Sequence, residues 1–365
     1  MADLTKRLAE LTPDKREVLA KLLRNRAEKS IPREQAKQSE QPEQPKQLKP
    51  RTAPNVSGAT AVAVSVAAPG TPASEAEHLV LDASSPSEPS ALKASYKRFY
   101  DGVSAQLNGN VFGQFSYFLN YGYVADGQPE FSAVKLPEQY INKNSVKLVL
   151  ELIGDCPVDG KRVLDVGCGR GGTVHVFNTF FKPARITGLD LSTTAIQFCK
   201  EAHKGQHITF HEGDAESLPF EDSSFDIVTN VESSHSYPHI HRFYSEVHRV
   251  LAPGGHFLYT DVLSDQQAVS NIAYLQHVGF EVVRDRDITN NVLVSCDEIA
   301  MTRVQAFDSR NDQQLMQNFL ATPGSQVYEE MRSGRWTYRI LKLQKRPSNV
   351  DFDSDSNSSK VTGKW

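Results

Sequence analysis

The stretch that decides the fold is Val163-Leu-Asp-Val-Gly-Cys-Gly-Arg-Gly-Gly172. Its apolar start is typical of a buried strand, and Gly167 and Gly169 allow the backbone to turn sharply and to approach a ligand closely. The glycines match Gly-x-Gly-x-x-Gly, a pattern that indicates a nucleotide-like cofactor at a strand-to-helix turn. Because such strings also occur at purely structural turns, the segments that follow decide the interpretation.

Two further acidic residues, Asp190 and Asp214, follow at near-equal intervals. Each follows a short apolar run and precedes a polar turn or a helical segment, which is typical of alternating strands and helices. In an open parallel sheet, ligands bind outside the carboxyl ends of the strands. We therefore expect Asp165, Asp190 and Asp214 to point at one crevice, with Asp190 accepting hydrogen bonds from a ribose diol.

Two cofactors compete for this crevice. A nicotinamide dinucleotide also requires the glycine turn and an acid on the second strand, but it places a pyrophosphate at the helix N-terminus. Asp165, two residues before Gly167, would repel that group. A cationic cofactor without phosphate fits better, and S-adenosylmethionine (SAM) is one. We expect its ammonium and sulfonium near Asp165, its ribose near Asp190 and its adenine near Asp214.

The ordered motifs over roughly residues 160–262 resemble those of class I SAM-dependent methyltransferases. They are Val163-Leu-Asp-Val-Gly-Cys-Gly169, Gly188-Leu-Asp190, Gly213-Asp-Ala-Glu-Ser-Leu-Pro-Phe220, Phe225-Asp-Ile-Val228 and Val250-Leu-Ala-Pro-Gly-Gly-His256. Within that superfamily, Asn230-Val-Glu-Ser-Ser-His-Ser-Tyr-Pro-His239 and Trp336-Thr-Tyr-Arg-Ile340 resemble polyketide O-methyltransferases. These include the phthiotriol dimycocerosate methyltransferases and the O-methyltransferase domains of modular polyketide synthases.

This resemblance implies an α/β fold with a doubly wound, mostly parallel seven-stranded sheet and a helical, aromatic-rich cap. It also implies methyl transfer from SAM to a hydroxyl or enol of a polyketide-like or lipid substrate, in natural-product biosynthesis. The positions expected to contact the cofactor are Tyr121, Asp165, Gly167, Cys168, Gly169, Asp190, Leu191, Asp214, Ala215 and Asn230.

Catalysis needs alignment of the reactants and a base that takes the proton of the acceptor. Glu232 and His235 directly follow the expected fourth strand, and their spacing on a helical turn would place both on one face. We predict His235 as the base, with Glu232 as its orienting partner. A local hydrogen-bonding role for His235 and a cofactor or lid contact for Glu232 are the alternatives. His239 is the reserve base, and we expect Asp261 to cap the following helix rather than to face the pocket.

Residues 91–145 are rich in aromatic side chains, which either pack in the core or form a lid over cofactor and substrate. The piece from Tyr117 to Tyr123 is the one most expected to face the cofactor. Residues 290–333 have a helical pattern and would form the second lid piece. The methyltransferase with both lid pieces is expected over residues 91–346.

The sequence of the remaining parts of the chain does not predict a packed domain. Residues 1–30 have two leucine stripes and resemble docking helices of polyketide and nonribosomal peptide assembly lines, which implies docking to such a synthase and an acyl carrier protein as a partner. Residues 31–90 and 347–365 cannot bury enough apolar surface to offset their ordering entropy, so we predict a disordered linker and tail.

Composition excludes several other classes. A net charge of −4 gives no reason to expect nucleic acid as a partner. Four scattered cysteines indicate neither a disulfide framework nor a zinc site, and His239-x-His241 without nearby carboxylates leads us to expect no metal. The start of the chain lacks the apolar core of a signal peptide, and no apolar run is long enough to span a bilayer. We therefore expect a cytoplasmic protein.

Two other functions remain open at this point. One is C-methylation of a β-ketoacyl carbon, or methylation of a sterol or free lipid. The other is a docking module whose methyltransferase core has lost activity, against which the three acidic residues and the two glycines argue.

Overall fold

The computed structural model describes the chain from residue 88 onward, with short gaps. Residues 1–30 lie outside the described part, as do all but three residues of the expected linker and all but one of the expected tail. Everything described belongs to one compact unit, which is assigned to Thr71–Trp365. The described residues are 88–109, 116–127, 130–138, 140–304 and 317–347.

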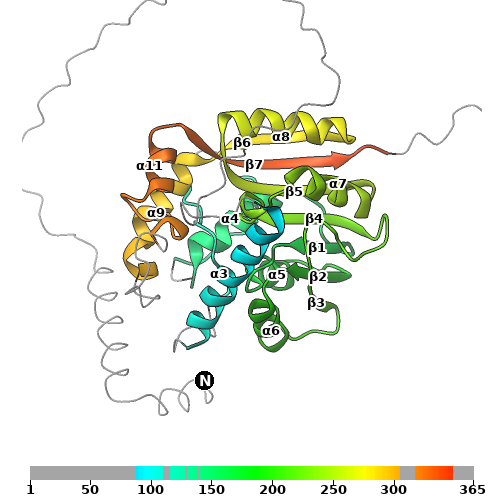
Figure 1. Cartoon of the computed structure of the whole chain (residues 1–365), viewed down its shortest axis with the longest axis horizontal. Helices are drawn as coiled ribbons and strands as arrows, with labels where there is room; N and C mark the ends of the chain where they lie inside the picture. The colour runs from blue at the N-terminus through cyan, green and yellow to red at the C-terminus, as the bar shows by residue number, and fades with distance from the viewer. Residues whose placement is uncertain (1–87, 110–115, 128–129, 139, 305–316, 348–365) are drawn as a thin grey trace, which may run out of the picture. The chain divides into compact units, whose positions relative to one another are not determined.

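One seven-stranded sheet organises this unit (Figure 1). The strand order is β3-β2-β1-β4-β5-β7-β6, and β7 runs antiparallel to both of its neighbours, whereas the other pairs are parallel. The predicted doubly wound, mostly parallel sheet is therefore confirmed. The strands are β1 (Arg162–Val166), β2 (Arg185–Asp190), β3 (Ile208–Glu212), β4 (Phe225–Val231), β5 (Leu251–Ser264), β6 (Phe280–Asp287) and β7 (Trp336–Lys345).

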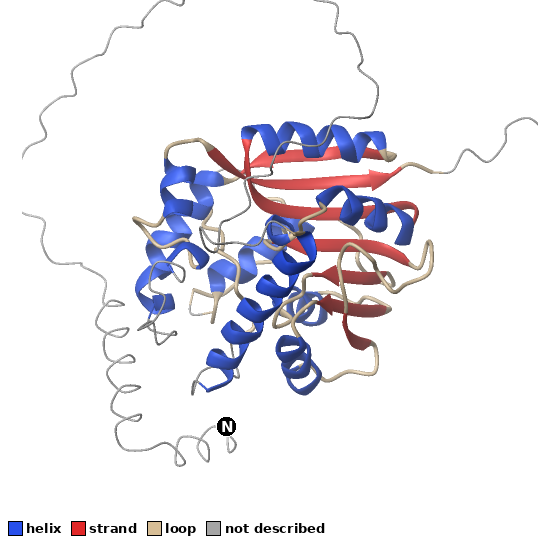
Figure 2. Ribbon diagram, viewed as in Figure 1, coloured by secondary structure: helices blue, strands red, loops and turns tan. Residues whose placement is uncertain are grey.

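Helices cover both faces of the sheet, as Figure 2 shows. The side chains of α4, α5, α6, α9 and α11 share one apolar cluster with the sheet, and those of α7 and α8 share another. The helices are α3 (Pro89–Gly109), α4 (Lys143–Ile153), α5 (Gly172–Phe180), α6 (Thr193–Ala202), α7 (Ile240–Val250), α8 (Asp265–His277), α9 (Thr289–Val304) and α11 (Gln326–Arg332), with a 3-10 turn, η2 (Ser234–Ser236).

The position of β1 within the sheet explains its three apolar residues. Val163 packs in the first cluster, whereas Leu164 and Val166 pack in the second. All three are fully buried because a parallel sheet is covered on both faces. β1 pairs with β2 on one side and β4 on the other, so its carboxyl end lies at the centre of the sheet edge where ligands bind.

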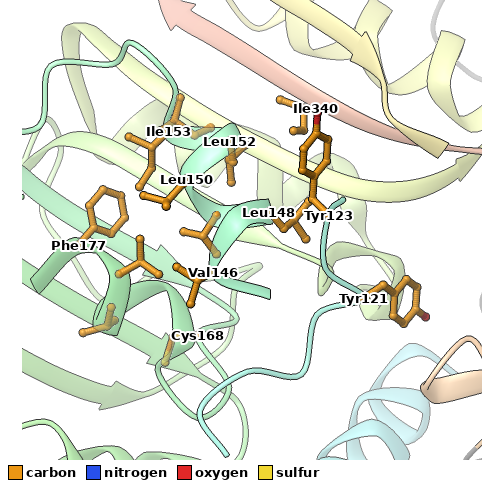
Figure 3. Packing of buried hydrophobic residues seen from close by; sticks show 14 of the residues in the cluster. Tyr121, Tyr123, Val146, Leu148, Leu150, Leu152, Ile153, Cys168, Phe177 and Ile340 are labelled. Carbon is orange, nitrogen blue, oxygen red and sulfur yellow. The ribbon is translucent and has the colours of Figure 1, made fainter. Parts of the chain in front are cut away.

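The segment 116–127 combines the two roles that its aromatic residues suggested. In Figure 3 the ring of Tyr123 lies beside Ile340, whereas Tyr121 points away from the aliphatic side chains of α4. The backbone of the segment is held by two hydrogen bonds, from Tyr123 N to Asn144 O (2.9 Å) and from Val124 N to Asn291 O (3.1 Å). Both rings are buried in the first cluster, and Tyr121 also lines the cavity described below.

Three boundaries differ from expectation. Helix α3 begins at Pro89, two residues inside the expected linker, and α9 begins at Thr289, earlier than the pattern indicated. Asp261 does not cap α8, because β5 continues to Ser264. Ser264 is the cap instead, and it forms a capping box with Gln267. No helix in the described ranges has the length and apolarity needed to cross a membrane.

Candidate active site

A cavity lies where the strands end and the cap begins. Its wall includes the turn after β1 (Gly167 to Gly169), Asp190 at the end of β2, Asp214 just beyond β3, and Glu232 and His235 after β4. The cap contributes residues of α3, the segment 117–121 and Phe319. The predicted edge of the sheet is therefore the one that carries a cavity, and both expected cap pieces reach it.

The glycine turn is folded as its sequence predicts. Gly167 and Gly169 have φ angles of 69° and 49°, which L side chains rarely adopt. The backbone N–H groups of Gly167 and Cys168 donate to Leu189 O at 2.8 and 3.0 Å. A Cβ atom at position 167 would lie only 2.2 Å from Ser233 Oγ, so the turn contacts the loop after β4 and has no room for a side chain.

Asp190 is tied to the glycine turn. Its Oδ2 accepts a hydrogen bond from Gly169 N at 2.7 Å, and its Oδ1 accepts one from Ser192 N at 2.8 Å. Burial raises the pKa of this carboxyl, while the two backbone donors act in the opposite direction. An ionised carboxylate has about four acceptor positions, so Asp190 retains acceptors for hydroxyl groups in the cavity. Its neighbour Leu191 also lines the cavity.

Asp214 makes an ion pair that the sequence did not indicate. Its Oδ2 lies 2.6 Å from Lys93 Nζ of α3, and its Oδ1 accepts from Glu216 N at 2.9 Å. Lys93 also lies 2.5 Å from Glu216 Oε2. Asp214, Ala215 and Lys93 all line the cavity, so a residue of the cap closes the wall at the end of β3.

Asp165 lies behind the cavity wall rather than in it. Asp165 is the fourth of the five residues of β1 and only 1% exposed, and its Oδ1 accepts from Thr229 Oγ1 at 2.7 Å. Burial raises the pKa of Asp165 to about 7, and the Thr229 and Thr173 hydroxyls act in the opposite direction. Thr173 lines the cavity, whereas Asp165 does not. Of the three carboxylates expected in one crevice, two therefore lie in its wall and Asp165 lies beneath it.

Asn230 is also behind the wall, and it joins the two halves of the site. Its Nδ2 donates to Val166 O (2.9 Å) and to Ser233 Oγ (2.7 Å), and it lies 3.2 Å from Tyr237 Oη. Its side chain is fully buried. Asn230 therefore holds the loop after β4 against the end of β1.

His235 lines the cavity, but its hydrogen-bond partner is not the expected one. Its Nδ1 lies 2.8 Å from Oδ1 of Asp261, a carboxylate with no solvent exposure. The other oxygen of Asp261 accepts from Ser234 Oγ (2.6 Å) and His235 N (3.1 Å). Burial lowers the pKa of His235, but the charges of Asp261 and Glu232 outweigh it, so the pKa is raised above 6.5. The orienting partner of His235 is thus Asp261.

Glu232 instead holds the segment that carries Tyr121. Its Oε1 accepts from Tyr121 N at 2.8 Å and from the hydroxyl of Tyr338 in β7. Its φ angle of 49° shows that no regular helical turn joins it to His235, which is why the spacing argument was wrong about their pairing. A left-handed conformation at a glutamate is strained, and such strain concentrates at functional sites.

The reserve base is not part of the cavity wall. His239 directly precedes α7, and its backbone N donates to Glu216 Oε1 at 2.7 Å. The ring of His241 stacks on Tyr274 with centroids 3.9 Å apart. Neither histidine lines the cavity that His235 lines.

Sequence reasoning missed Lys93, Tyr100 and Arg170. Lys93 and Tyr100 are on α3, and the Tyr100 hydroxyl lies 3.0 Å from Ser236 Oγ, next to His235. Arg170 follows Gly169 and is 1% exposed. A helical pattern shows that α3 has an apolar side, but it cannot show which strand ends that side covers. Arg170 lies within the glycine motif itself, and this position was the one sequence feature that could have marked it as a residue of the site.

Comparison with known proteins identifies the family. A methyltransferase domain matches residues 164–259. A fatty-acid O-methyltransferase of Mycolicibacterium smegmatis is 37% identical over 234 residues, which cover 61% of this chain and 81% of that protein. The chain belongs to the SAM-dependent methyltransferases. The phthiotriol/phenolphthiotriol dimycocerosates methyltransferase of Mycobacterium tuberculosis is 33% identical over 231 residues, covering 62% of this methyltransferase and 85% of the relative.

A solved structure shows the same fold. It is a geranyl diphosphate methyltransferase in complex with GPP and sinefungin, with a TM-score of 0.52, 20% identity, and coverage of 71% of this chain and all of that one. The residues at the crevice of this methyltransferase fit S-adenosylmethionine. The turn at Gly167 leaves room only for backbone, Asp190 has acceptors left for a ribose, and the segment that carries Tyr121 lines the cavity.

Proposed function

We propose that this enzyme transfers a methyl group from S-adenosylmethionine to a hydroxyl oxygen of a lipid or polyketide-like substrate, with His235 as the base. The observation that carries the proposal is His235 in the cavity wall, with its Nδ1 on the buried carboxylate of Asp261. When bound, S-adenosylmethionine supplies an electrophilic methyl group on a positively charged sulfur.

The pair of His235 and Asp261 suits proton removal from an alcohol. With Nδ1 donating to Asp261, the nitrogen left for a ligand is Nε2, which can accept the proton of a hydroxyl. The buried charge of Asp261 then stabilises the imidazolium that forms. Because an aliphatic hydroxyl is a poor acid, a base of this kind contributes roughly 100- to 10,000-fold to the rate.

The cap supports an apolar acceptor. The cap residues that line the cavity are largely aromatic. They include Tyr96, Tyr100, Tyr117, Phe118, Tyr121 and Phe319, together with Leu119. Such a surface buries an aliphatic or aromatic chain and excludes water from the reacting atoms. The names of the relatives, a fatty-acid O-methyltransferase and phthiotriol dimycocerosates methyltransferases, are consistent with lipid acceptors.

A carboxylate acceptor is the second candidate, favoured by the raised pKa of His235. If the imidazole carries a proton, its Nε2 donates a hydrogen bond to an anionic oxygen and positions it without accepting a proton. Hydroxyl methylation requires neutral His235 and increases as pH rises through its pKa. If the imidazolium holds a carboxylate acceptor, the rate of methylation decreases over the same pH range. The two candidates therefore predict opposite pH profiles.

We further propose that the acceptor is bound to an acyl carrier protein in natural-product biosynthesis. The support is the resemblance of residues 1–30 to docking helices and the likeness of the site motifs to polyketide O-methyltransferases. The expected docking to a synthase rests on residues outside the described part of the chain, so it stays a prediction.

Product mass spectrometry tests these proposals together. The full chain is incubated with S-adenosylmethionine and four acceptors of one chain length: a 3-hydroxyacyl carrier protein, a 3-oxoacyl carrier protein, the free 3-hydroxy acid and the plain fatty acid. Addition of one methyl to the hydroxyl of the carrier-bound substrate supports the proposal. Methylation of carbon on the oxo substrate, or of the free carboxyl alone, would replace it. Cofactor binding without any methylated product from a broad acceptor set would point to an inactive docking module.

A further inference from the structure

Two lysines tie helix α3 to the end of β3. Lys97 Nζ lies 3.3 Å from Glu212 Oε1, and Lys93 contacts the residues just beyond the strand. Lys93 Nζ lies 2.6 Å from Asp214 Oδ2 and 2.5 Å from Glu216 Oε2. Lys93 and Asp214 line the cavity, where Asp214 is expected beside the adenine, whereas Glu216 does not line it. The side chains of Lys93 and Asp214 are 24% and 37% exposed, so solvent and salt reach this ion pair.

One turn further on, α3 is tied to the connection between β2 and α6, beside which it runs (Figure 1). Lys97 Nζ donates to Leu191 O at 3.0 Å and to Thr193 Oγ1 at 2.6 Å. Asp101 Oδ1 accepts from Ser192 Oγ at 2.6 Å. These contacts hold the residues directly after Asp190, so the stretch of α3 from Lys93 to Asp101 is attached beside both acidic residues in the wall.

The C-terminal half of α3 is held by contacts of a different kind. Arg170, only 1% exposed, donates to Ser104 Oγ at 2.9 Å and to Asn108 Oδ1 at 2.8 Å. Val103 and Leu107 pack there with Leu320 in a separate apolar cluster. A buried cation at the C-terminal end of a helix is favourably placed relative to the helix dipole. This end of α3 therefore behaves as a fixed attachment.

We propose that Lys93 is a positioning residue for the adenosine end of the cofactor and controls its exchange. By pairing with Asp214 and Glu216, Lys93 holds the carboxylate at the end of β3 and keeps the N-terminal half of α3 closed over the crevice. Cofactor and demethylated product pass when these ion pairs break and α3 moves about its attachment at Arg170. The inference depends on the crevice holding the cofactor and is independent of which acceptor is methylated.

The direct test is the dissociation rate of S-adenosylhomocysteine, measured by stopped-flow displacement on the full chain. Replacing Lys93 by methionine keeps much of the apolar stem but removes both ion pairs. We expect dissociation to become roughly 3- to 10-fold faster, because the variant loses the partly exposed pair with Asp214 and also leaves the Glu216 side chain, only 2% exposed, without its cation. In the wild type, dissociation should accelerate between about 0.05 M and about 0.5 M salt, and this dependence should be weaker in Lys93→Met.

The chain offers a matched control. Lys147 of α4 lies 2.7 Å from Glu130 Oε1, its side chain is 23% exposed, and it does not line the cavity. Lys147→Met should therefore leave the dissociation rate and its salt dependence unchanged. Equal rates in Lys93→Met and Lys147→Met would overturn the proposal. Lys93→Arg keeps the charge and is expected to retain the salt dependence of the wild type.

Hydrogen exchange gives a second measurement that does not depend on the variants folding equally well. In the wild-type protein without ligand, amides of residues 93–101 should exchange faster than those of residues 104–108, and S-adenosylhomocysteine should slow the first group most. Uniform protection along α3, unaffected by the ligand, would show that the helix does not open from its N-terminal end and would exclude the proposal.

Discussion

His235 Nδ1 lies 2.8 Å from Oδ1 of Asp261, and the Asp261 side chain has no solvent exposure. The two residues come from different elements, because His235 belongs to the 3-10 turn η2 and Asp261 to the interior of β5. This pairing fixes which ring nitrogen of His235 is left for a ligand. It also places a buried negative charge directly beside the imidazole, so protonation of His235 alters the interaction between the two side chains.

Removal of either member of this pair should reduce turnover while cofactor binding persists. We expect His235→Ala to lower kcat by roughly 100- to 10,000-fold, as for loss of a general base. Asp261→Asn should also lower kcat, because the imidazolium loses its stabilising charge. Calorimetric titration with S-adenosylmethionine is the control and should give a Kd close to that of the wild type. A His235→Ala enzyme with full activity on an alcohol would exclude His235 as the base.

The pH profile follows from the raised pKa of His235. A base must be neutral to accept a proton, so kcat/KM for a hydroxyl acceptor should increase with pH, with a midpoint above 6.5. Because Asp261 raises the pKa and burial lowers it, Asp261→Asn should shift the midpoint to lower pH. Initial rates between about pH 5 and about pH 9 in both proteins measure the shift. A profile that falls over this range would favour the carboxylate acceptor.

Asp190 should contribute more to cofactor affinity than any other carboxylate in the wall. Asp190→Ala removes the acceptor of Gly169 N and of the ribose hydroxyls, so we expect Kd to rise by roughly 10- to 100-fold. Calorimetry of S-adenosylhomocysteine binding measures this change. Asp155→Ala is a suitable comparison, since Asp155 pairs with Lys342 outside the cavity and should leave Kd unchanged. Equal affinities in the two variants would mean that the ribose lies elsewhere.

Two glycines with similar φ angles allow the effect of backbone strain to be measured apart from the effect of close packing. Gly167 and Gly160 have φ angles of 69° and 73°, but only a Cβ at position 167 would meet other atoms, the nearest at 2.2 Å. Both alanine variants should lose about 1–2 kcal/mol of stability from the left-handed conformation. We expect Gly167→Ala alone to abolish cofactor binding, measured on protein that remains folded by circular dichroism. Intact binding in Gly167→Ala would contradict the packing seen at this turn.

Asp165 gives a prediction about stability. Its pKa is 3.8 in the unfolded chain and about 7 in the fold, so between these values the folded protein binds the additional proton. The free energy of unfolding therefore falls as pH rises through this window. Without cofactor, Asp165→Asn should be more stable than the wild type at pH 8 by about 1–2 kcal/mol, or roughly 3–6 °C in Tm, and about equal at low pH. A lower Tm for Asp165→Asn at pH 8 would argue against this account.

The sequence predicted those parts of the site that depend on strand ends. The β1 run, its glycine turn and Asp190 follow from local patterns, because parallel strands bring their carboxyl ends to one edge. It is harder to predict from the sequence where the side chain of a residue within a strand points. Asp165 lies three-quarters of the way along β1, and its side chain points beneath the wall toward Thr229.

Contacts between distant segments could not be predicted. Asp261 is 26 residues from His235, and its role depends on how far β5 extends, which neither spacing nor composition determines. Glu232 was assigned to the wrong partner because its left-handed φ breaks the assumed helical turn. Lys93 and Asp214 are 121 residues apart, and a lysine on an amphipathic helix is most simply read as solvated. Pairings of this kind require the tertiary structure.

The hydrogen bonds of Asn230 link the loop that carries His235 to the end of β1. The expected binding regions for the methyl donor and the methyl acceptor are therefore connected. The loop that carries His235 contacts the turn at Gly167, so substitutions introduced there to admit a new acceptor should also disturb affinity for the methyl donor. Substitutions around Phe319 do not share this constraint. Diversification of substrate range, by natural selection or in the laboratory, should therefore accumulate in the cap around Phe319, while residues 230–237 change little.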